Sequence, residues 1–248
     1  MRIIPLMEGA FTIDSSKRFV PFNLGTDNLQ ERPTGSLLVE IQPFVIITEE
    51  DILLLDTGLG FRDASQTLQI HQNLINVGIN PMEVTKVLMS HLHKDHAGGI
   101  GSVDPHTGQP TFNFPGATYY VQRKELEYAL GKGAPSYIPE ELEVLKGNDR
   151  VVFLEEAEGH IGDHIRYQVT GGHSPFHQVF WLTEGGETIF FGGDDAPQLA
   201  QMKNRFVAKY DYDGKKCMEL RRQWWEEGAV GHWTFLFYHD IKYPSVTL

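Results

Sequence analysis

The stretch HLHKDH at residues 91–96 gathers three histidines and an aspartate within six positions. Imidazole nitrogens and carboxylate oxygens are the ligands that suit zinc and neighbouring divalent metals. Alternate residues of an extended segment point the same way, so His91 and His93 are placed to hold one ion. Asp95 and His96 can then turn toward a second ion nearby. Because a short apolar run precedes the stretch and reads as a buried strand, we expect a metal loop rather than a polar surface turn.

The composition is that of an ordinary globular chain, with 248 residues and 41% hydrophobic residues, enough for one large domain. The formal net charge is −12, which argues against a nucleic-acid partner because such partners usually need a basic face. No run reaches about 18 apolar residues, and the N-terminus lacks the apolar stretch of a secretory signal. We therefore predict a single cytoplasmic domain over residues 1–248, with no nucleic-acid and no membrane partner. The one cysteine, Cys217, rules out an intrachain disulfide and reads as a helix residue of no special chemistry.

Strand and helix patterns alternate along the chain, with no internal repeat and no domain break. A first strand is expected within residues 2–13, a polar loop over 14–34 and a strand pair within 36–47. Further strands are predicted at 51–55, 84–89, 117–121, 151–154, 165–169, 178–183, 188–191 and 233–238. Helices are predicted at 63–78, 122–130, 139–145 and 213–228. This order fits two mixed β-sheets stacked face to face, with helices outside.

The HLHKDH stretch resembles the HxHxDH signature of the metallo-β-lactamase superfamily of metal-dependent hydrolases. The resemblance implies an α/β fold, the four-layer αβ/βα sandwich of two mixed sheets flanked by helices, with metals at one edge of the sheets. Three downstream residues match the remaining ligand positions. His173 lies in a Gly-Gly-His-Ser-Pro turn that looks like the family's GHTPGH segment, although Phe176 stands where glycine is common. Asp194 ends an apolar strand after two glycines, and His239 follows the last apolar run.

The resemblance assigns seven ligands to two ions. One ion takes His91, His93 and His173, and the second takes Asp95, His96 and His239. Asp194 bridges the two ions, together with a water or hydroxide. Asp56, in the Asp-Thr-Gly run at 56–58, supports the ligands from outside, since such carboxylates fix the tautomer and orientation of a ligand.

Two histidine and aspartate neighbours compete for these assignments. His177 is the rival of His173 in the same turn, and Asp195 is the rival of Asp194. A rival that does not bind metal is expected to pack or hydrogen-bond beside the site. His160 and His164 read as surface histidines.

The ligand types predict the reaction class. A divalent metal lowers the pKa of bound water from about 15.7 to about 7 and polarises a carbonyl or phosphoryl oxygen. We therefore expect two divalent ions per chain, with zinc favoured, and hydrolysis of an ester-like bond by a metal-bridging hydroxide. Asp194 and Asp95 are the candidate catalytic residues, because Asp194 holds both ions and Asp95 lies close enough to pass a proton to the leaving group.

The ligand types and the length of the chain after the last ligand indicate which branch of the superfamily the sequence resembles. The bridging Asp and the lack of a Cys ligand point away from β-lactamases. The chain ends nine residues after His239, so we expect no glutathione-binding helical domain of the glyoxalase II type. The remaining resemblance is to the branch of N-acyl homoserine lactone lactonases and parathion-hydrolase-like enzymes.

We therefore predict a small-molecule substrate, a lactone or carboxylic ester with an apolar substituent such as an N-acyl homoserine lactone. The apolar segments 19–24, 112–114 and 137–138 are candidates for the groove wall, with Tyr137 and Ile138 expected to be exposed. A thioesterase and a phosphodiesterase or organophosphate hydrolase are the alternatives on the same site. A non-catalytic or di-iron redox protein is the alternative of another class. A homodimer is compatible with the sequence.

Overall fold

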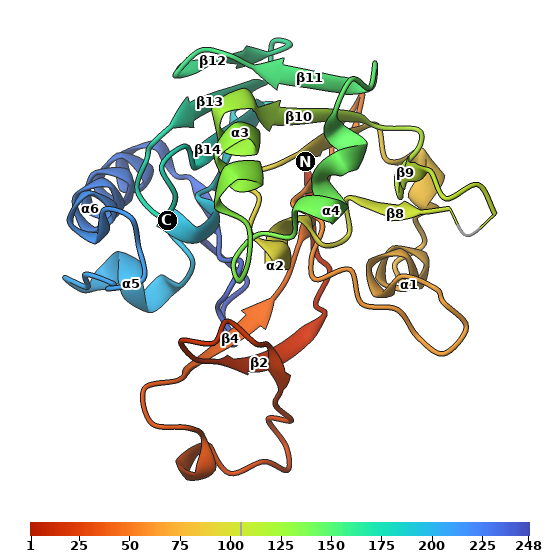
Figure 1. Ribbon diagram of the computed structural model, residues 1–248. Helices are drawn as coiled ribbons and strands as arrows, with labels where there is room; N and C mark the ends of the chain where they lie inside the picture. Colours follow the sequence, from red (N-terminus) through yellow and green to blue (C-terminus); the bar gives the residue numbers. More distant parts are fainter. Residues whose placement is uncertain (105) are drawn as a thin grey trace.

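The computed structural model describes residues 1–104 and 106–248 (Figure 1). Its centre is a pair of six-stranded mixed β-sheets. The first sheet runs in the order β1, β5, β6, β7, β10 and β11. These strands span Arg2–Pro5, Phe44–Ile47, Ile52–Leu55, Lys86–Leu88, Thr118–Gln122 and Val151–Leu154. Because β6, β7, β10 and β11 are parallel neighbours, the loops that follow them meet at one edge of the sheet.

The second sheet runs in the order β12 to β17. Its strands span Glu158–Ile161, Ile165–Val169, Gln178–Glu184, Glu187–Phe191, Thr234–Leu236 and Ser245–Thr247. All neighbours are antiparallel except β15 and β16, which are parallel. Strands β14 and β15 form a hairpin, in which Glu184 pairs with Glu187 across two glycines of positive φ.

Three apolar clusters hold four layers together. The central cluster fills the space between the sheets and includes Phe44 of β5 and Phe191 of β15, whose ring centroids lie 6.2 Å apart. The outer face of the first sheet packs against α1, α3 and α4, and the outer face of the second against α5 and α6. These helices span Gln69–Asn76, Arg123–Lys132, Pro139–Leu142, Leu199–Lys203 and Gly214–Gly231. The predicted four-layer sandwich is therefore confirmed.

Shorter elements lie around the sandwich. A three-stranded sheet of β3, β2 and β4 projects from one end, and residues 22–36, between β3 and β4, extend beyond it (Figure 1). Its strands span Val20–Pro21, Gly9–Ile13 and Leu37–Ile41, and a β8–β9 hairpin spans Gly101–Val103 and Pro110–Phe112. Helix α2 spans Lys94–Ala97, and 3₁₀ turns lie at Leu29–Glu31, Pro81–Glu83, Glu143–Leu145 and Gly193–Asp195. Among the described residues, no helix is both long and apolar enough to cross a membrane.

Several predicted bounds are wrong for identifiable reasons. The predicted first strand is in fact two strands, β1 and β2. Residues Leu6–Glu8 separate them, and the two strands belong to different sheets. The helix predicted at 63–78 begins only at Gln69, because the Asp63 carboxylate accepts hydrogen bonds from the backbone of Ser65 and Thr67 and holds a turn there. The last predicted strand shortens to β16, and β17 follows it.

Candidate metal centre

The predicted ligands all follow strand ends at one edge of the two sheets. The HLHKDH stretch leaves β7 as a loop and then forms α2, with His93 as its N-terminal cap. His173 follows β13, Asp194 lies in the 3₁₀ turn after β15, and His239 follows β16. Strands of both sheets thus place each polar side chain at the same edge. Both carboxylates and all five histidines of the predicted set meet in two adjoining groups.

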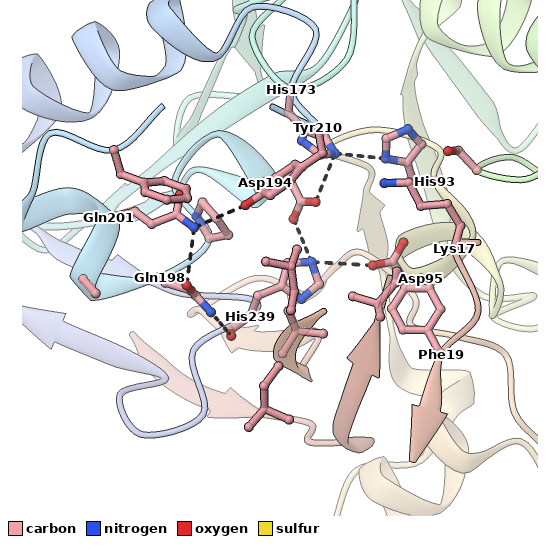
Figure 2. A pocket seen from close by; sticks show the side chains of 18 of the residues that line it. Lys17, Phe19, His93, Asp95, His173, Asp194, Gln198, Gln201, Tyr210 and His239 are labelled. Atoms are coloured by element: carbon pink, nitrogen blue, oxygen red, sulfur yellow. Dashed lines mark hydrogen bonds and ion pairs between the residues drawn. The ribbon is translucent and has the colours of Figure 1, made fainter. Parts of the chain in front are cut away.

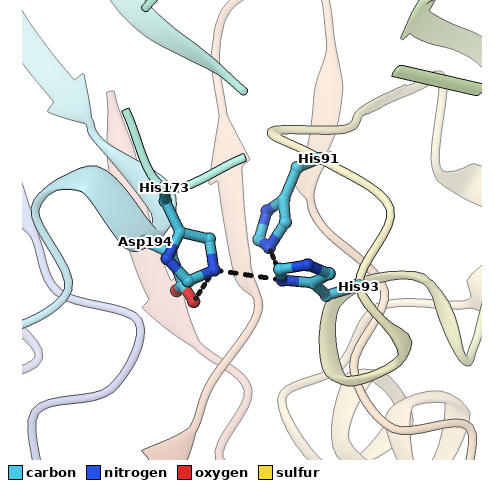
Figure 3. A group of neighbouring side chains, drawn as sticks. All are labelled: His91, His93, His173 and Asp194. Carbon is cyan, nitrogen blue, oxygen red and sulfur yellow. Dashed lines mark hydrogen bonds and ion pairs between the residues drawn. The ribbon is translucent and has the colours of Figure 1, made fainter. Parts of the chain in front are cut away.

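The first group consists of three imidazoles and one carboxylate (Figure 3). His93 Nδ1 lies 2.9 Å from His91 Nε2 and 3.0 Å from His173 Nε2. His173 Nε2 lies 3.1 Å from Asp194 Oδ2. One ligand atom from each of the four residues lies within 4.8 Å of the others, which is close enough to share one ion.

The second group consists of His96, His239 and Asp95, whose ligand atoms also lie within 4.8 Å of one another. Asp95 Oδ2 is 3.7 Å from His96 Nε2 and 3.5 Å from His239 Nε2. Asp194 Oδ1 is 3.1 Å from His96 Nε2 and 3.0 Å from His239 Nε2. The two oxygens of Asp194 therefore face different groups, Oδ2 the first and Oδ1 the second.

Charge and burial move the pKa values of the ligand residues in two directions. Burial lowers the pKa of His96, His173 and His239, but the neighbouring Asp194 carboxylate outweighs it and raises all three pKa values. Burial and neighbouring histidines hold the pKa of His91 and of His93 well below the usual range, so both rings are neutral. Burial raises the pKa of Asp194, but the nearby His239, His96 and His173 outweigh it and hold the pKa well below its usual range. An ionised carboxylate and neutral imidazoles are the forms that bind a cation.

Hydrogen bonds behind the rings fix which nitrogen faces the site. His91 Nδ1 is 3.0 Å from Ser90 Oγ, and His239 Nδ1 is 2.8 Å from the backbone oxygen of Glu40. His96 Nδ1 is 2.7 Å from Asp56 Oδ2, and His173 Nδ1 is 2.8 Å from Asp211 Oδ1. In these four residues Nε2 is left to face the cluster, whereas His93 presents Nδ1. Carboxylates and carbonyls in this position set the tautomer of a ligand.

Asp56 directly follows β6 and lies behind the His96 ring. It is fully buried and has a φ of 58°, unusual for a residue other than glycine. Its Oδ1 accepts a hydrogen bond of 2.7 Å from Ser90 N, and its Oδ2 accepts one of 2.6 Å from Ser90 Oγ. With the contact to His96, this one carboxylate links the two ends of the HLHKDH loop.

The rivals of the predicted ligands lie behind the cluster. His177 Nδ1 faces Asp195 Oδ2 at 3.1 Å, and His177 Nε2 accepts a hydrogen bond of 3.1 Å from Asp194 N. Asp195 Oδ1 accepts one of 2.7 Å from His173 N. Both rivals therefore position the backbone of a neighbouring site residue. The buried thiol of Cys217 points at the same Asp195 oxygen from α6, at 3.4 Å. His160 and His164 are exposed, as predicted.

Two supporting carboxylates were not found from the sequence. Asp211 lies in the loop before α6, and no motif marks it. Glu125 is buried in α3, where it accepts hydrogen bonds from Leu92 N, the Tyr137 hydroxyl and Ser174 Oγ at 3.2, 3.1 and 2.9 Å. Tyr137 is therefore buried against Glu125 and His93, and the prediction that it is exposed is wrong. Glu125 stands out only as an acidic residue on the inner face of a helix.

The residues present fit metal cations. His96 Nε2 and Asp194 Oδ1 are buried and face each other, yet neither has a hydrogen-bond partner in the described part of the chain. Buried polar atoms left in this way are costly unless another group satisfies them. Imidazole nitrogen and carboxylate oxygen form a donor set typical of zinc.

Residues 39–237 match the metallo-beta-lactamase superfamily. The chain belongs to this superfamily. N-acyl homoserine lactonase AttM of Agrobacterium fabrum is 35% identical over 112 residues, which are 42% of this chain and 38% of that protein. AttM of Azorhizobium caulinodans is 46% identical over 54 residues, 22% of this chain and 16% of that protein. The matched segments thus span well under half of these curated relatives.

Solved structures of other proteins share the fold. A probable metal-dependent hydrolase from Staphylococcus aureus superposes with a TM-score of 0.78 at 23% identity, over 99% of this chain and 91% of that one. AidC, a dizinc quorum-quenching lactonase in complex with a product, gives 0.72 at 20% identity, over 99% and 89% of the two chains. At these identities the likeness concerns the fold, and with the family match it confirms the predicted superfamily.

A cavity of about 320 Å³ opens beside the cluster in this superfamily member (Figure 2). His93, Asp95, Asp194 and His239 form its polar floor. The projecting sheet and the α5 region supply most of its walls, chiefly through Ile13, Phe19, Leu37, Leu38, Val39, Ala200 and Phe206. Gln198, Gln201 and the Tyr210 hydroxyl add polar groups on one side.

Only part of the predicted groove wall lies at this cavity. Phe19 lines it, whereas Val20 and Leu24 are exposed and do not. Phe112 and Phe114 pack on the far side of the first sheet, so the prediction for segment 112–114 is wrong. Both rings pack in the apolar cluster on the outer face of the first sheet, where Phe112 stacks on Tyr119 with ring centroids 4.0 Å apart.

Proposed function

We propose that this chain is a two-zinc hydrolase of a lactone or carboxylic ester with an apolar substituent. The proposal rests on the orientation of the Asp194 carboxylate. Its Oδ2 faces the first group of ligand atoms and its Oδ1 faces the second. A carboxylate placed in this way suits a bridge between two cations. The proposed ligands are His91, His93, Asp95, His96, His173, Asp194 and His239.

The chemistry is the addition of water to a carbonyl carbon. Cations bound at the two groups supply a strong oxygen nucleophile at neutral pH and an electrophile for the carbonyl oxygen. A new carbon–oxygen bond forms, the bond to the leaving oxygen breaks, and one proton of the water ends on that oxygen. Asp95 borders the cavity beside Asp194, so its carboxylate is placed to carry this proton. The proton transfer therefore falls to a residue of the second ligand group.

The cavity supports an apolar substituent on the substrate. Leucine, isoleucine, valine and phenylalanine side chains cover the wall that the projecting sheet presents to the cluster. One methylene against such a wall changes discrimination by only about 1–3 kcal/mol. Lengthening the acyl chain of a lactone series should therefore raise kcat/KM gradually. That AttM relatives are named lactonases supports lactones as the first class to test.

A substrate panel tests the proposal. The purified, zinc-loaded protein would be assayed with N-hexanoyl homoserine lactone, phenyl hexanoate, S-lactoylglutathione, bis-nitrophenyl phosphate and a cephalosporin, with D194A as the inactive control. We expect turnover of the lactone, the ester or both. Turnover of the phosphodiester or thioester alone would favour the alternative hydrolases, and iron with visible colour in the purified protein would favour the redox alternative. A cytoplasmic location, a homodimer and a single domain over residues 1–248 remain predictions of the sequence alone.

A further inference from the structure

Two cavities meet at the ligand residues and share part of their lining, and Lys17 and Lys94 line the first of them beside its apolar side chains. The first, of about 320 Å³, is the mainly apolar cavity described above, here called the apolar arm. The second, of about 590 Å³, is lined by residues of the 13–17 turn, the 132–137 segment and the 209–212 loop, and is here called the cationic arm. His93, His173, Lys17 and Tyr210 line both arms. A substrate with its scissile bond at the cluster can therefore extend in two directions.

The cationic arm takes its character from three lysines. Lys17, Lys132 and Lys209 come from three separate segments of the chain and line the same cavity. Tyr128 and Tyr212 add aromatic walls between them. Against the two aspartates of the same lining, Asp14 and Asp211, the three lysines leave a formal charge of +1 (3 − 2) in a chain of net charge −12.

These lysines are not used in ion pairs within the described residues. The lysine and arginine side chains paired there with carboxylates are Lys86, Arg123, Lys146, Lys215 and Arg222. Two aspartates do line the cationic arm, but both have other partners. Asp14 accepts hydrogen bonds from Ser16 at 2.6 and 2.8 Å, and Asp211 is bound to His173. The three ammonium groups are thus available to a ligand.

Lys17 stands where the two arms join. It lies at the end of a tight turn, donating from its backbone N to Asp14 O at 3.0 Å, and its φ is 58°. Its Nζ lies 5.8 Å from the centre of the Tyr210 ring, and Figure 2 shows its side chain beside His93. A backbone in the left-handed region is uncommon for lysine, so this turn directs the side chain at some conformational cost.

We propose that the substrate carries an anionic group, a carboxylate or phosphate, on the side of the scissile bond opposite its apolar substituent. This inference rests on the proposed hydrolysis and adds the charge of the substrate to it. The apolar substituent lies in the apolar arm, and the anion lies among Lys17, Lys132 and Lys209. A neutral N-acyl homoserine lactone would then bind through the apolar arm and leave the three lysines of the cationic arm without a ligand.

Isosteric substrate pairs test the charge directly. The zinc-loaded protein would be assayed with 4-carboxyphenyl hexanoate against 4-carbamoylphenyl hexanoate, and with monophenyl adipate against its terminal amide. Each kcat/KM would be divided by the rate of hydroxide-catalysed hydrolysis of the same ester. Binding of 4-(hexyloxy)benzoate and 4-(hexyloxy)benzamide, which cannot be hydrolysed, would be measured by calorimetry. We expect the anionic member of at least one ester pair to be favoured about tenfold, with tighter binding of the benzoate.

Lysine variants decide whether the arm causes the preference. Lys17→Gln and Lys209→Gln should each lower the anion-to-neutral ratio about threefold, whereas Lys124→Gln, an exposed lysine of α3 outside both cavities, should leave it unchanged. No preference for an anion in either pair would overturn the inference while ester turnover still supported the proposed function. A preference unchanged in K17Q and K209Q would also overturn it, because the carboxylate would then be bound elsewhere. Absence of all ester turnover would contradict the proposed function, and the benzoate and benzamide affinities of wild type, K17Q and K209Q would still test the arm, because only binding at the lysines weakens in the variants.

Discussion

Replacing Asp56 with asparagine should disable His96 as a ligand without changing the size of the side chain. Asp56 Oδ1 accepts from Ser90 N, so the new amide nitrogen takes the place of Oδ2. That position lies 2.6 Å from Ser90 Oγ and 2.7 Å from His96 Nδ1. The serine hydroxyl can rotate to accept a hydrogen bond. His96 Nδ1 can accept only if the ring proton moves to Nε2, which is the atom that faces Asp194.

The size of the effect follows from burial. Asp56 and His96 are both fully buried, so no water replaces the lost contact. A hydrogen bond to a charged group contributes about 1.5–3 kcal/mol. Loss of such an outer partner typically weakens metal binding about 10–100-fold. D56N should therefore weaken zinc binding at the His96 group by about this factor and leave the group of His91 and His173 nearly unchanged.

Zinc content measured by mass spectrometry across a series of zinc buffers would check this prediction. D51N is the matched control, because Asp51 also loses one charge and its contacts to Thr85 and Lys86 but lies away from the ligand residues. Wild type and D51N should fill both sites in parallel, and D56N should fill one site at much higher free zinc. Identical filling of D56N and D51N would refute the argument that Asp56 sets the tautomer of His96.

Three further predictions follow from other parts of the molecule. Asp194→Ala should lose at least about tenfold more activity than Asp195→Ala, because Asp194 faces both ligand groups, and equal losses would contradict this. Burial raises the pKa of Glu8 to about 7, so the buried carboxyl must ionise as the pH rises from 5 to 8. Over this range the unfolding free energy of wild type should fall by about 3 kcal/mol relative to that of E8Q. Parallel urea-denaturation curves for the two proteins across that range would count against it. Gly99→Ala should lower the unfolding free energy by about 2–4 kcal/mol in thermal melts, since a Cβ there would lie 2.1 Å from Thr57 O, and an unchanged melting temperature would show that the loop yields.

The sequence predicted the gathering of the site because local patterns mark it. Asp194 and His239 each follow an apolar strand, whereas His173 follows β13, in which buried and exposed residues alternate. Neighbouring strands end at one sheet edge. A strand pattern in the local sequence therefore helps to predict that residues far apart in the chain lie close together. Asp56 was assigned by the resemblance of its Asp-Thr-Gly run, and in the structure it directly follows β6, which lies beside β7.

The supporting residues could not be found in this way. Asp211 reaches His173 from a loop 38 positions away, and the oxygen that holds His239 is a backbone atom of Glu40. Neither has a periodic or spacing signal. Tyr137 looked like an exposed residue in an irregular segment, but its burial depends on Glu125 of α3, which only the tertiary packing brings near. Contacts of this kind are decided by how loops pack on the finished sheets.

The most direct test of the two-metal account is a zinc titration of activity. The chain would be stripped of metal with a chelator, and hydrolysis of N-hexanoyl homoserine lactone and phenyl hexanoate would be followed as zinc is added in steps. Because the two oxygens of Asp194 face different ligand groups, we predict that activity rises until about two zinc ions are bound per chain and then levels off. Full activity at one bound zinc, or activity that does not depend on metal, would contradict the account.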